Sequence, residues 1–446
     1  MMKLFSSVVL LFVVFFQFVL SQQPVVLTLD KAVELALERN LSIIKTQNDV
    51  DAAQSRVLTA YGSYLPTISA SGGWDRNQRT GVQRIQGIAI PGATSTSTNN
   101  SFQAGVNLGY TIFDGLRREA NFNSITSSAI STEQIAARMR QTIINGVESA
   151  YLNVLKFEQL MKVNDENLKR DRQQLERITE SNRIGALSLA DVYRQQSQVA
   201  ADEYKVIQAQ NDYDNAKADL VALIGLDMNM DYQISDQSIS TVIGSVELNA
   251  TVEKYKNFNE LVKRALSIRP DYLAAKENYD VSESGVTAAR SGYFPRITAS
   301  AGYNLSSSEF SKLSDNKNLS WGINLNWNIF DAFQTNQVLQ SAIVLKKNSE
   351  ATLKQSERDI SVEVKRALLN LEAARKQVEV SQKGVISASQ DRKIAEERYN
   401  LGAGTLLDLL TASVGYVTAE VNNISASYFY ITAKRNLEYV IGERSN

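Results

Sequence analysis

The two halves of the chain repeat each other, and this duplication constrains the fold more than any other feature of the sequence. Three pairs of segments carry the match: 36–74 with 265–303 at an offset of 229, then 105–115 with 322–332 and 224–225 with 441–442, both at an offset of 217. A period this long indicates two copies of one structural unit. We therefore expect a first repeat at 22–225, a linker segment at 226–257 and a second repeat at 258–446.

The N-terminus has the features of a secretory signal peptide. One lysine precedes an apolar run from Val8 to Leu20, and Val19 and Ser21 occupy the positions that a signal peptidase reads. We expect 1–21 to be removed and the mature chain to be exported. An uncleaved N-terminal anchor is the alternative.

The composition excludes several classes of function. There is no Cys and no His in the 446 residues, which removes disulfides, thiolate nucleophiles, Ser-His-Asp triads and metal sites built on imidazole or thiolate. The net charge of −1 gives no basic surface for nucleic acid. No P-loop motif is present, so a nucleotide does not supply energy here. We expect no catalytic residues, no metal and no cofactor.

Two segments in each repeat alternate apolar and polar residues, which predicts β-strands. The expected strands are about 67–79, 102–113, 296–306 and 319–330. From 67 to 74 and in its counterparts, one face is apolar and the other carries uncharged Asn, Ser, Thr and Gly. This pattern is typical of outer-membrane β-barrels, whose aromatic residues lie at the membrane interfaces. The expected interface aromatics are Trp74, Tyr110, Tyr303, Trp321 and Trp327.

A β-hairpin packed on a soluble core also explains the alternation, but it does not explain the missing charges. Four strands cannot close a barrel, and an open sheet edge in lipid leaves backbone groups unpaired. If the strands lie in the membrane, several chains must therefore build one barrel together.

The helices are longer than a globular domain needs. The segment 115–182 spans 68 residues without proline, a rod of roughly 100 Å. Its apolar residues recur every seven positions, as do those of its counterpart 332–399, so we expect coiled-coil packing. Shorter helices are expected at 188–224 and 405–441, and also at 28–62 and 258–291.

Each long helix is interrupted in the same way before the next helix starts. Gly185 and Gly402 can adopt the left-handed conformation that ends a helix. Ser188 with Asp191, and Thr405 with Asp408, have the spacing of capping boxes. Each break therefore ends one helix and starts the next.

The order of these elements resembles the TolC-like outer membrane efflux protein family. The resemblance is carried by YLP before the first strand, IFDG or IFDA after the second, and the repeated G-x5-D break. It implies a mainly α fold with a membrane β-barrel: a homotrimer with one 12-stranded barrel in the outer membrane and an α-helical tunnel across the periplasm. It also implies a passive exit duct of a tripartite efflux or type I secretion system, in contact with outer-membrane lipid, a periplasmic adaptor protein and an inner-membrane pump.

The resemblance also implies roles for residues at the hairpins. Asp191, Asp408 and Tyr399 match positions that close the tunnel, whereas Asp191 and Asp408 are helix caps in the structural alternative. The adaptor-docking tip comprises eight positions: Gly185, Ala186, Leu187, Ser188, Gly402, Ala403, Gly404 and Thr405. The sequence departs from the family at Gly404, where some members have an arginine, and at Thr411, where an acidic residue can occur. The linker 226–257 is expected to form part of a belt around the tunnel.

Two other classes of protein remain open. An exported coiled-coil stalk or spacer explains the heptads and the duplication, but not the charge-free strands. An exported glycosidase needs an isolated pair of carboxylates, whereas the 48 acidic residues are spread mainly over helix surfaces.

Overall fold

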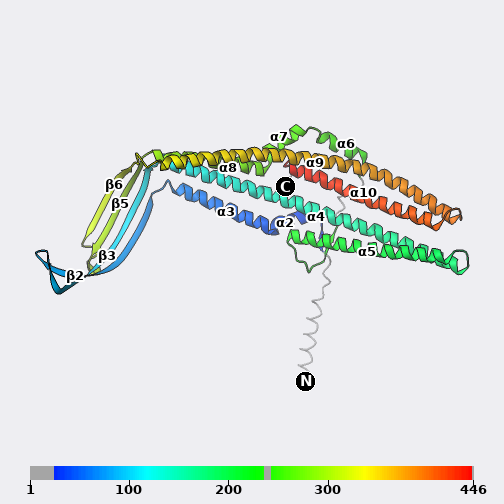
Figure 1. Ribbon diagram of the computed structural model, residues 1–446, viewed down its shortest axis with the longest axis horizontal. Coiled ribbons are helices and arrows are strands. Elements are labelled where there is room, and N and C mark those ends of the chain that lie inside the picture. The colour runs from blue at the N-terminus through cyan, green and yellow to red at the C-terminus, as the bar shows by residue number, and fades with distance from the viewer. Residues whose placement is uncertain (1–24, 236–242, 444–446) are drawn as a thin grey trace, which may run out of the picture. The chain divides into compact units, whose positions relative to one another are not determined.

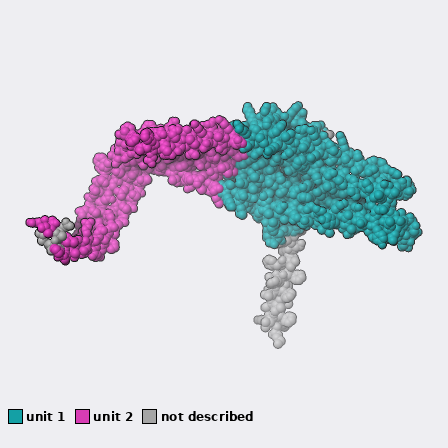
Figure 2. Space-filling view, in the orientation of Figure 1, with its two compact units in different colours: residues 1–47, 136–270, 357–446 teal, residues 48–135, 271–356 magenta. Residues whose placement is uncertain are grey.

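A computed structural model describes residues 25–235 and 243–443 of the chain. The expected signal peptide, 1–21, lies outside these residues. The chain forms two compact units (Figure 2): unit 1 comprises 1–47, 136–270 and 357–446, and unit 2 comprises 48–135 and 271–356. Each unit takes segments from both sequence repeats, so the units do not coincide with the repeats.

Among the described residues, no helix combines the length and the apolar character needed to cross a membrane.

Unit 2 contains a four-stranded antiparallel sheet with the strand order β2-β3-β5-β6 (Figure 1). Its strands are β2 (Thr67–Ile85), β3 (Ile88–Phe113), β5 (Arg296–Ser307) and β6 (Lys317–Asn326). The register aligns residues of like character across the sheet, because Ala70, Val106, Tyr303 and Leu319 are Cα partners in turn. Within the described residues, β2 and β6 each pair with one strand only, so the sheet ends in two unpaired edges.

The hairpin of β2 and β3 is much longer than expected. The predicted ends at 79 and 102 are wrong, because the two strands continue to pair as far as Ile85 and Ile88. The turn between them has a positive φ at both Gln86 (49°) and Gly87 (84°), as a tight type I′ hairpin turn requires. The pairing therefore continues through Thr- and Ser-rich sequence that has no apolar alternation.

Strand β6 is shifted relative to the prediction of 319–330. It begins at Lys317 and ends at Asn326, opposite Arg296, which is the first residue of β5. Because β5 offers no further residue to pair with, Trp327 lies outside the strand. Its indole N–H donates instead to the carbonyl oxygen of Tyr293, at 3.1 Å, in the short 3-10 turn Ser291–Tyr293.

Four long helices form the rest of the framework: α4 (Arg117–Arg183), α5 (Leu189–Ile224), α9 (Gln334–Asn400) and α10 (Leu406–Val440). The core of unit 1 includes the stripe Ile143, Val147 and Val154 of α4 and Leu220 of α5. At its centre the buried hydroxyl of Tyr151 donates to the carbonyl oxygen of Leu27 at 2.9 Å.

The expected helices 28–62 and 258–291 are each broken in two. The first is α2 (Leu29–Arg39) and α3 (Leu41–Gly62), and the second is α7 (Phe258–Ile268) and α8 (Pro270–Arg290). The residues at the breaks, Asn40 and Arg269, have an extended backbone with ψ of 123°. The side-chain amide of Asn40 donates to the carbonyl oxygen of Leu223 at 2.9 Å, and Arg269 donates to that of Val440 at 3.0 Å. The side chain at each break thus donates a hydrogen bond to a backbone carbonyl near the end of α5 or α10.

The linker between the repeats has its own structure. Strand β4 (Tyr232–Ile234) pairs in parallel with β1 (Val25–Leu27), and α6 (Ser245–Lys254) follows. The hydroxyl of Tyr430 in α10 lies 2.9 Å from the hydroxyl of Thr251 in α6. The linker is therefore bound to β1 through β4 and to α10 through α6.

Candidate functional site

The first hairpin loop, residues 184–188, joins α4 to α5. Gly185 has φ of 78°, and the amides of Gly185 and Ala186 donate to the carbonyls of Asn182 and Ser181 at 2.8 and 2.9 Å. These two bonds satisfy the last carbonyls of α4, which is the role of a glycine helix end. The hydroxyl of Ser188 accepts from the amide of Asp191 at 3.2 Å and starts α5.

The second hairpin loop, residues 401–405, joins α9 to α10 with the same geometry. Gly402 has φ of 72°, and the amide of Ala403 donates to the carbonyl of Arg398 at 2.8 Å. Here the capping box is complete, because the amide of Thr405 also donates to Asp408 at 3.0 Å. The backbone bond from Thr405, followed by the bond from its hydroxyl, holds the pKa of Asp408 below its usual value.

Gly404, in the second hairpin loop, lies close to the C-terminal end of α9. A Cβ atom at Gly404 would lie 3.2 Å from the Cβ of Arg398 and 3.3 Å from the amide nitrogen of Tyr399. The guanidinium of Arg398 also donates to the carbonyl of Ala403 at 3.3 Å. A larger residue at 404 therefore needs a small shift of the loop, which suits the glycine found here.

The two hairpins meet in unit 1 through a small apolar cluster, and their loops lie at the same end of the helices (Figure 1). Ile178, Val192 and Leu406 form its centre, and Leu187 and Tyr399 pack against it. This cluster brings one residue of each predicted group together: Leu187 from the tip and Tyr399 from the gate.

Tyr399 is the most informative residue of the predicted gate. Burial raises the pKa of its hydroxyl, the nearby charge of Asp191 raises it further, and Arg177 opposes this. The structure thus places Tyr399 and Asp191 close together. The hydroxyl oxygen is buried and has no hydrogen-bond partner among the described residues of the protomer. Asp408 is exposed and its carboxylate binds its own cap.

A buried polar cluster between α4 and α5 was not predicted. Asp171 is 8% exposed, Asp202 is 1% exposed, and Gln195 is fully buried. The side chain of Gln195 donates to the backbone carbonyl of Asp171 at 3.1 Å, and the two carboxyl groups share a hydrogen bond. Lys205 pairs with Asp202 at 3.1 Å.

The two carboxyl groups of this cluster titrate very differently. Burial, followed by the hydrogen bond to Asp202 and its charge, raises the pKa of Asp171 to about 7. Burial also favours a high pKa for Asp202, but hydrogen bonds from Asp171, Gln198 and Lys205 hold it below its usual value. At neutral pH the pair therefore holds one proton for part of the time.

The sequence did contain a signal for this cluster. Asp171 lies between Leu168 and Leu175 in the apolar stripe of α4, where a carboxylate is out of place. At the offset of 217, the counterparts in the second hairpin are all alanine: Ala388 for Asp171, Ala412 for Gln195 and Ala419 for Asp202. A charged residue at a position where the other repeat has alanine marks a place where the two hairpins differ.

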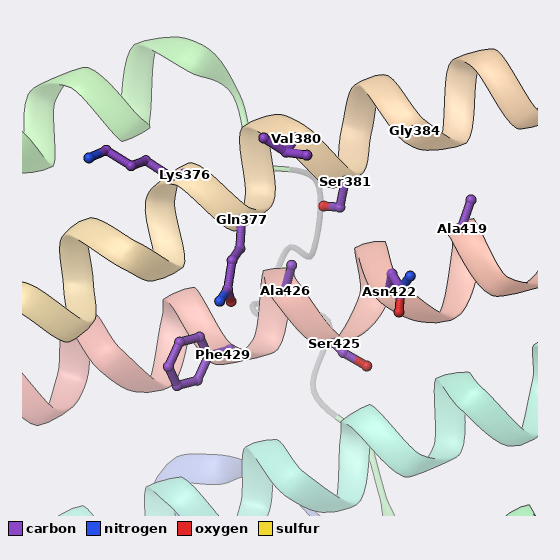
Figure 3. Close-up of a pocket in the computed structure, with 10 residues that line it drawn as sticks. All are labelled: Lys376, Gln377, Val380, Ser381, Gly384, Ala419, Asn422, Ser425, Ala426 and Phe429. Atoms are coloured by element: carbon purple, nitrogen blue, oxygen red, sulfur yellow. The ribbon is translucent and has the colours of Figure 1, made fainter.

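The second hairpin has a groove instead of a polar cluster. A cavity of about 830 Å³ lies along α9 and α10 and is lined mainly by apolar and small residues (Figure 3). In the close-up, Val380 and Gly384 lie on α9, and Ala419, Ala426 and Phe429 lie on α10. Val380 and Phe429 are exposed in the protomer.

The apolar face of the sheet in unit 2 is also exposed. Of the five expected interface aromatics, Trp321 is 82% exposed, and the other four are exposed as well: Trp74, Tyr110, Tyr303 and Trp327. An apolar sheet face with two unpaired edges, in a chain with pairs of very long helices, defines a channel-forming membrane protein with a helical extension.

Comparison with known proteins identifies the family. The family of outer membrane efflux proteins matches residues 32–226 and 261–443, which is most of the chain. The chain is 22% identical to the outer membrane protein TolC of Salmonella enteritidis over 417 residues, covering 90% of this chain and 79% of that protein. The chain belongs to the outer membrane efflux protein family.

Solved structures show the same fold. The outer membrane channel CmeC of Campylobacter jejuni has a TM-score of 0.78 at 20% identity, covering 93% of this chain and 85% of that chain. The outer membrane protein VceC of Vibrio cholerae has a TM-score of 0.77 at 18% identity, covering 93% and 96%. The predicted family, fold class and location are confirmed: the protein is an outer-membrane efflux channel with a helical periplasmic part.

Proposed function

We propose that three copies of the chain assemble into one passive exit duct across the outer membrane and the periplasm. The observation that carries this proposal is the pair of unpaired edges, β2 and β6, on a sheet whose apolar face is exposed. An edge in lipid leaves backbone N–H and C=O groups without partners, so other copies must cover it.

The number of copies follows from the size of the barrel. Two copies give eight strands, and a barrel of eight strands has an interior that side chains fill. Three copies give twelve strands from the four of each protomer, and the diameter grows with strand number. Three is therefore the smallest number that leaves a duct, and it agrees with the trimer that the family resemblance implies.

The helices support the same assembly. The groove on α9 and α10 and the exposed Val380 and Phe429 form an apolar surface that a neighbouring helical hairpin covers in a closed wall. A wall of hairpins from three protomers makes a tunnel below the barrel. The protein acts as a channel and not as an enzyme.

The gate lies at the hairpin loops. Tyr399 of the second hairpin lies near Asp191 of the first, and its buried hydroxyl is a donor without a partner among the described residues of the protomer. Three exposed Asp408 carboxylates around the axis attract cations and repel one another. Capping explains why an acid stands at 408, and the gate gives the same charge a second role.

The loops also bind the periplasmic adaptor. Gly185 to Ser188 and Gly402 to Thr405 form the docking tip, where a helical hairpin of the adaptor packs against the ends of α4, α5, α9 and α10. An inner-membrane pump joined through this adaptor supplies the energy. In the linker 226–257, the proposed belt, α6 contacts α10 through Thr251 and Tyr430, and β4 pairs with β1.

The test uses the fact that the natural chain has no cysteine. Single cysteines are placed along the two edges, with Ser69→Cys on β2 combined in turn with Ser320→Cys, Gly322→Cys or Asn324→Cys on β6. Oxidation is expected to link the purified protein into covalent trimers for one of these registers, and the detergent-extracted wild type is expected to have the mass of three chains. A single-copy mass, or covalent dimers only, overturns the proposal.

A further inference from the structure

A small cavity of about 60 Å³ lies between the two helical hairpins of unit 1. Residues of all four long helices line it: α4 and α5 of the first hairpin, and α9 and α10 of the second. Leu410 of α10 lines the cavity and also packs against the small apolar cluster that joins the hairpins. The cavity is large enough for a small ion or a few waters, whereas a drug-sized ligand needs at least about 300 Å³. Its occupant is therefore small.

Three positively charged side chains line this cavity. They are Arg170 and Arg177 on α4 and Arg392 on α9, and none of the three forms an ion pair with a residue that the structure describes. Arg170 donates to the side-chain oxygen of Asn167 at 3.4 Å, and Arg177 donates to that of Gln174 at 2.5 Å. A neutral amide accepts a hydrogen bond but leaves the charge of the guanidinium uncompensated.

The negative charge at the cavity is smaller than the positive charge. Its lining includes two acidic residues, Asp171 and Glu396. Burial, followed by the hydrogen bond to Asp202, raises the pKa of Asp171 to about 7, so its carboxyl group is protonated for part of the time at neutral pH. Three guanidinium groups therefore meet two carboxylates at most, and a small anion would neutralise the difference.

Two buried polar atoms at the cavity have no hydrogen-bond partner among the described residues: Nε of Arg392 and Oε1 of Gln195. Gln195 is fully buried, and its amide nitrogen already donates to the backbone carbonyl of Asp171 at 3.1 Å. The guanidinium carbon of Arg392 lies 4.5 Å from the centroid of the Tyr416 ring, which positions this group. One of the two unpartnered atoms is a donor and the other is an acceptor. A ligand that completes both must accept one hydrogen bond and donate another.

Few small ligands meet both requirements, for charge and for hydrogen bonding. Water accepts and donates hydrogen bonds, but it leaves the positive charge uncompensated. Chloride and sulfate neutralise the charge and accept hydrogen bonds, but at neutral pH neither carries a proton to donate. Inorganic phosphate at neutral pH is an anion that still carries at least one P–OH group, so it accepts from a guanidinium and donates to an amide oxygen.

We propose that this cavity binds inorganic phosphate in its hydrogen-bearing form, one ion per protomer. The guanidinium groups of Arg170 and Arg392 bind the phosphate oxygens through charge-assisted hydrogen bonds, and the P–OH group donates to Oε1 of Gln195. Because Arg170 belongs to the first hairpin and Arg392 to the second, the bound ion joins the two hairpins of one protomer. All of these residues lie in unit 1 of one chain, so the site does not depend on the proposed trimer.

The test measures anion binding to the full-length protein in neutral detergent at neutral pH by isothermal titration calorimetry. The probes are sodium phosphate, sodium sulfate and sodium chloride, with the ionic strength held constant by a bulky organic anion. We expect one phosphate per chain and about tenfold weaker binding of sulfate and of chloride, since these ions leave the buried acceptor of Gln195 unpaired. Equal binding of phosphate and sulfate by the wild type, or no saturable phosphate binding, overturns the proposal even if no variant folds.

Two variants test the two interactions separately. Arg392→Gln removes a cation and is expected to weaken phosphate binding about tenfold. Gln195→Met removes the acceptor at similar side-chain volume, so it is expected to weaken phosphate binding and to abolish the preference for phosphate over sulfate. Arg172→Gln is the matched control, because Arg172 is also on α4 but is exposed, paired with Glu203 at 2.7 Å and outside the cavity lining. Equal loss in Arg172→Gln, wild-type binding by Arg392→Gln, or an unchanged preference in Gln195→Met overturns the site.

Discussion

Replacing Asp171 by Asn is expected to remove a pH dependence from the stability of the first hairpin. The pKa of Asp171 is raised from 3.8 to about 7 by burial and by the neighbouring Asp202. Because the folded-state value lies above the unfolded one, the folded protein holds the extra proton, and its stabilising effect is complete below pH 4. The effect is lost as the pH rises towards 7. Any contribution from the lowered pKa of Asp202 changes only below its usual value of 3.8, outside this window.

The size of the stability change follows from the difference between the folded and unfolded pKa values of Asp171. One pKa unit corresponds to about 1.4 kcal/mol, so the wild-type protomer is roughly 4 kcal/mol less stable above pH 7 than below pH 4 on account of Asp171. Asn resembles the protonated acid in size and can donate to Asp202. The variant is therefore expected to match the wild type at low pH and to be more stable than the wild type above pH 7.

The assay is thermal unfolding of the purified protein in detergent, at steps from pH 4 to 8 and a fixed scan rate. The infrared band of a protonated carboxyl group, with a midpoint near pH 7 in the wild type only, is the direct check on the cause. Asp165→Asn is the control, because Asp165 lies on the same helix but its side chain is 46% exposed and is paired with Lys169. If Asp171→Asn keeps the wild-type slope, or the wild type shows no such band, the shared proton is refuted.

Three further predictions concern the gate and the helix breaks. Tyr399→Phe is expected to leave thermal stability unchanged, because the lost hydroxyl has no partner among the residues that the structure describes, but to raise single-channel conductance in planar bilayers. A destabilised variant with unchanged conductance contradicts this. Asp408→Asn keeps an acceptor for the cap and removes the charge, so it is expected to lower cation selectivity in bilayers. Asp408→Ala is expected to lower the selectivity and also to loosen the start of α10. Equal selectivity in the wild type and both variants leaves capping as the whole role of Asp408. Arg269→Ala is expected to destabilise unit 1 by about 2 kcal/mol, because it removes the hydrogen bond that the buried guanidinium donates to the carbonyl of Val440 and its ion pair with half-exposed Glu363. Denaturant unfolding should show a smaller loss, about 1 kcal/mol, for the equivalent Asn40→Ala. A larger loss at Asn40 than at Arg269 contradicts this prediction.

The sequence predicted the sheet wherever its strands have one apolar face, and it failed where both faces are polar. From Thr94 to Ser101 strand β3 reads as Thr, Ser and Asn on both sides. A strand of this kind has no periodicity to detect, and its structure comes from the partner strand β2 and from the tight turn at Gln86 and Gly87. The prediction at Trp327 failed for a different reason: the sequence there does alternate, but β5 begins at Arg296, opposite Asn326, and has no residue left to pair with Trp327.

The sequence around Arg269 did contain a signal for its helix break, because Pro270 follows it and a residue before proline is disfavoured in the helical conformation. Asn40 is of a type that favours helix starts, and its side-chain oxygen accepts from the backbone amide two residues on, at 2.9 Å. The fold adds contacts that the local sequence does not show, because both side chains also bond to carbonyls that lie 183 and 171 residues away along the chain. The proximity of Tyr399 and Asp191 likewise depends on the packing of two hairpins.

The duplication explains how a symmetric wall can have unequal parts. The two hairpin loops are built alike, with Gly185 matching Gly402 in backbone conformation. The buried contacts differ, since Asp171 and Asp202 stand where the second hairpin has Ala388 and Ala419. In the proposed trimer, six hairpins alternate between a polar, proton-binding interior and a small-residue interior. The repeated backbone gives the helical wall of the tunnel six similar units. The response of this wall to pH follows the three-fold symmetry of the chains, because only the first hairpin of each chain has the Asp171–Asp202 pair that takes up a proton.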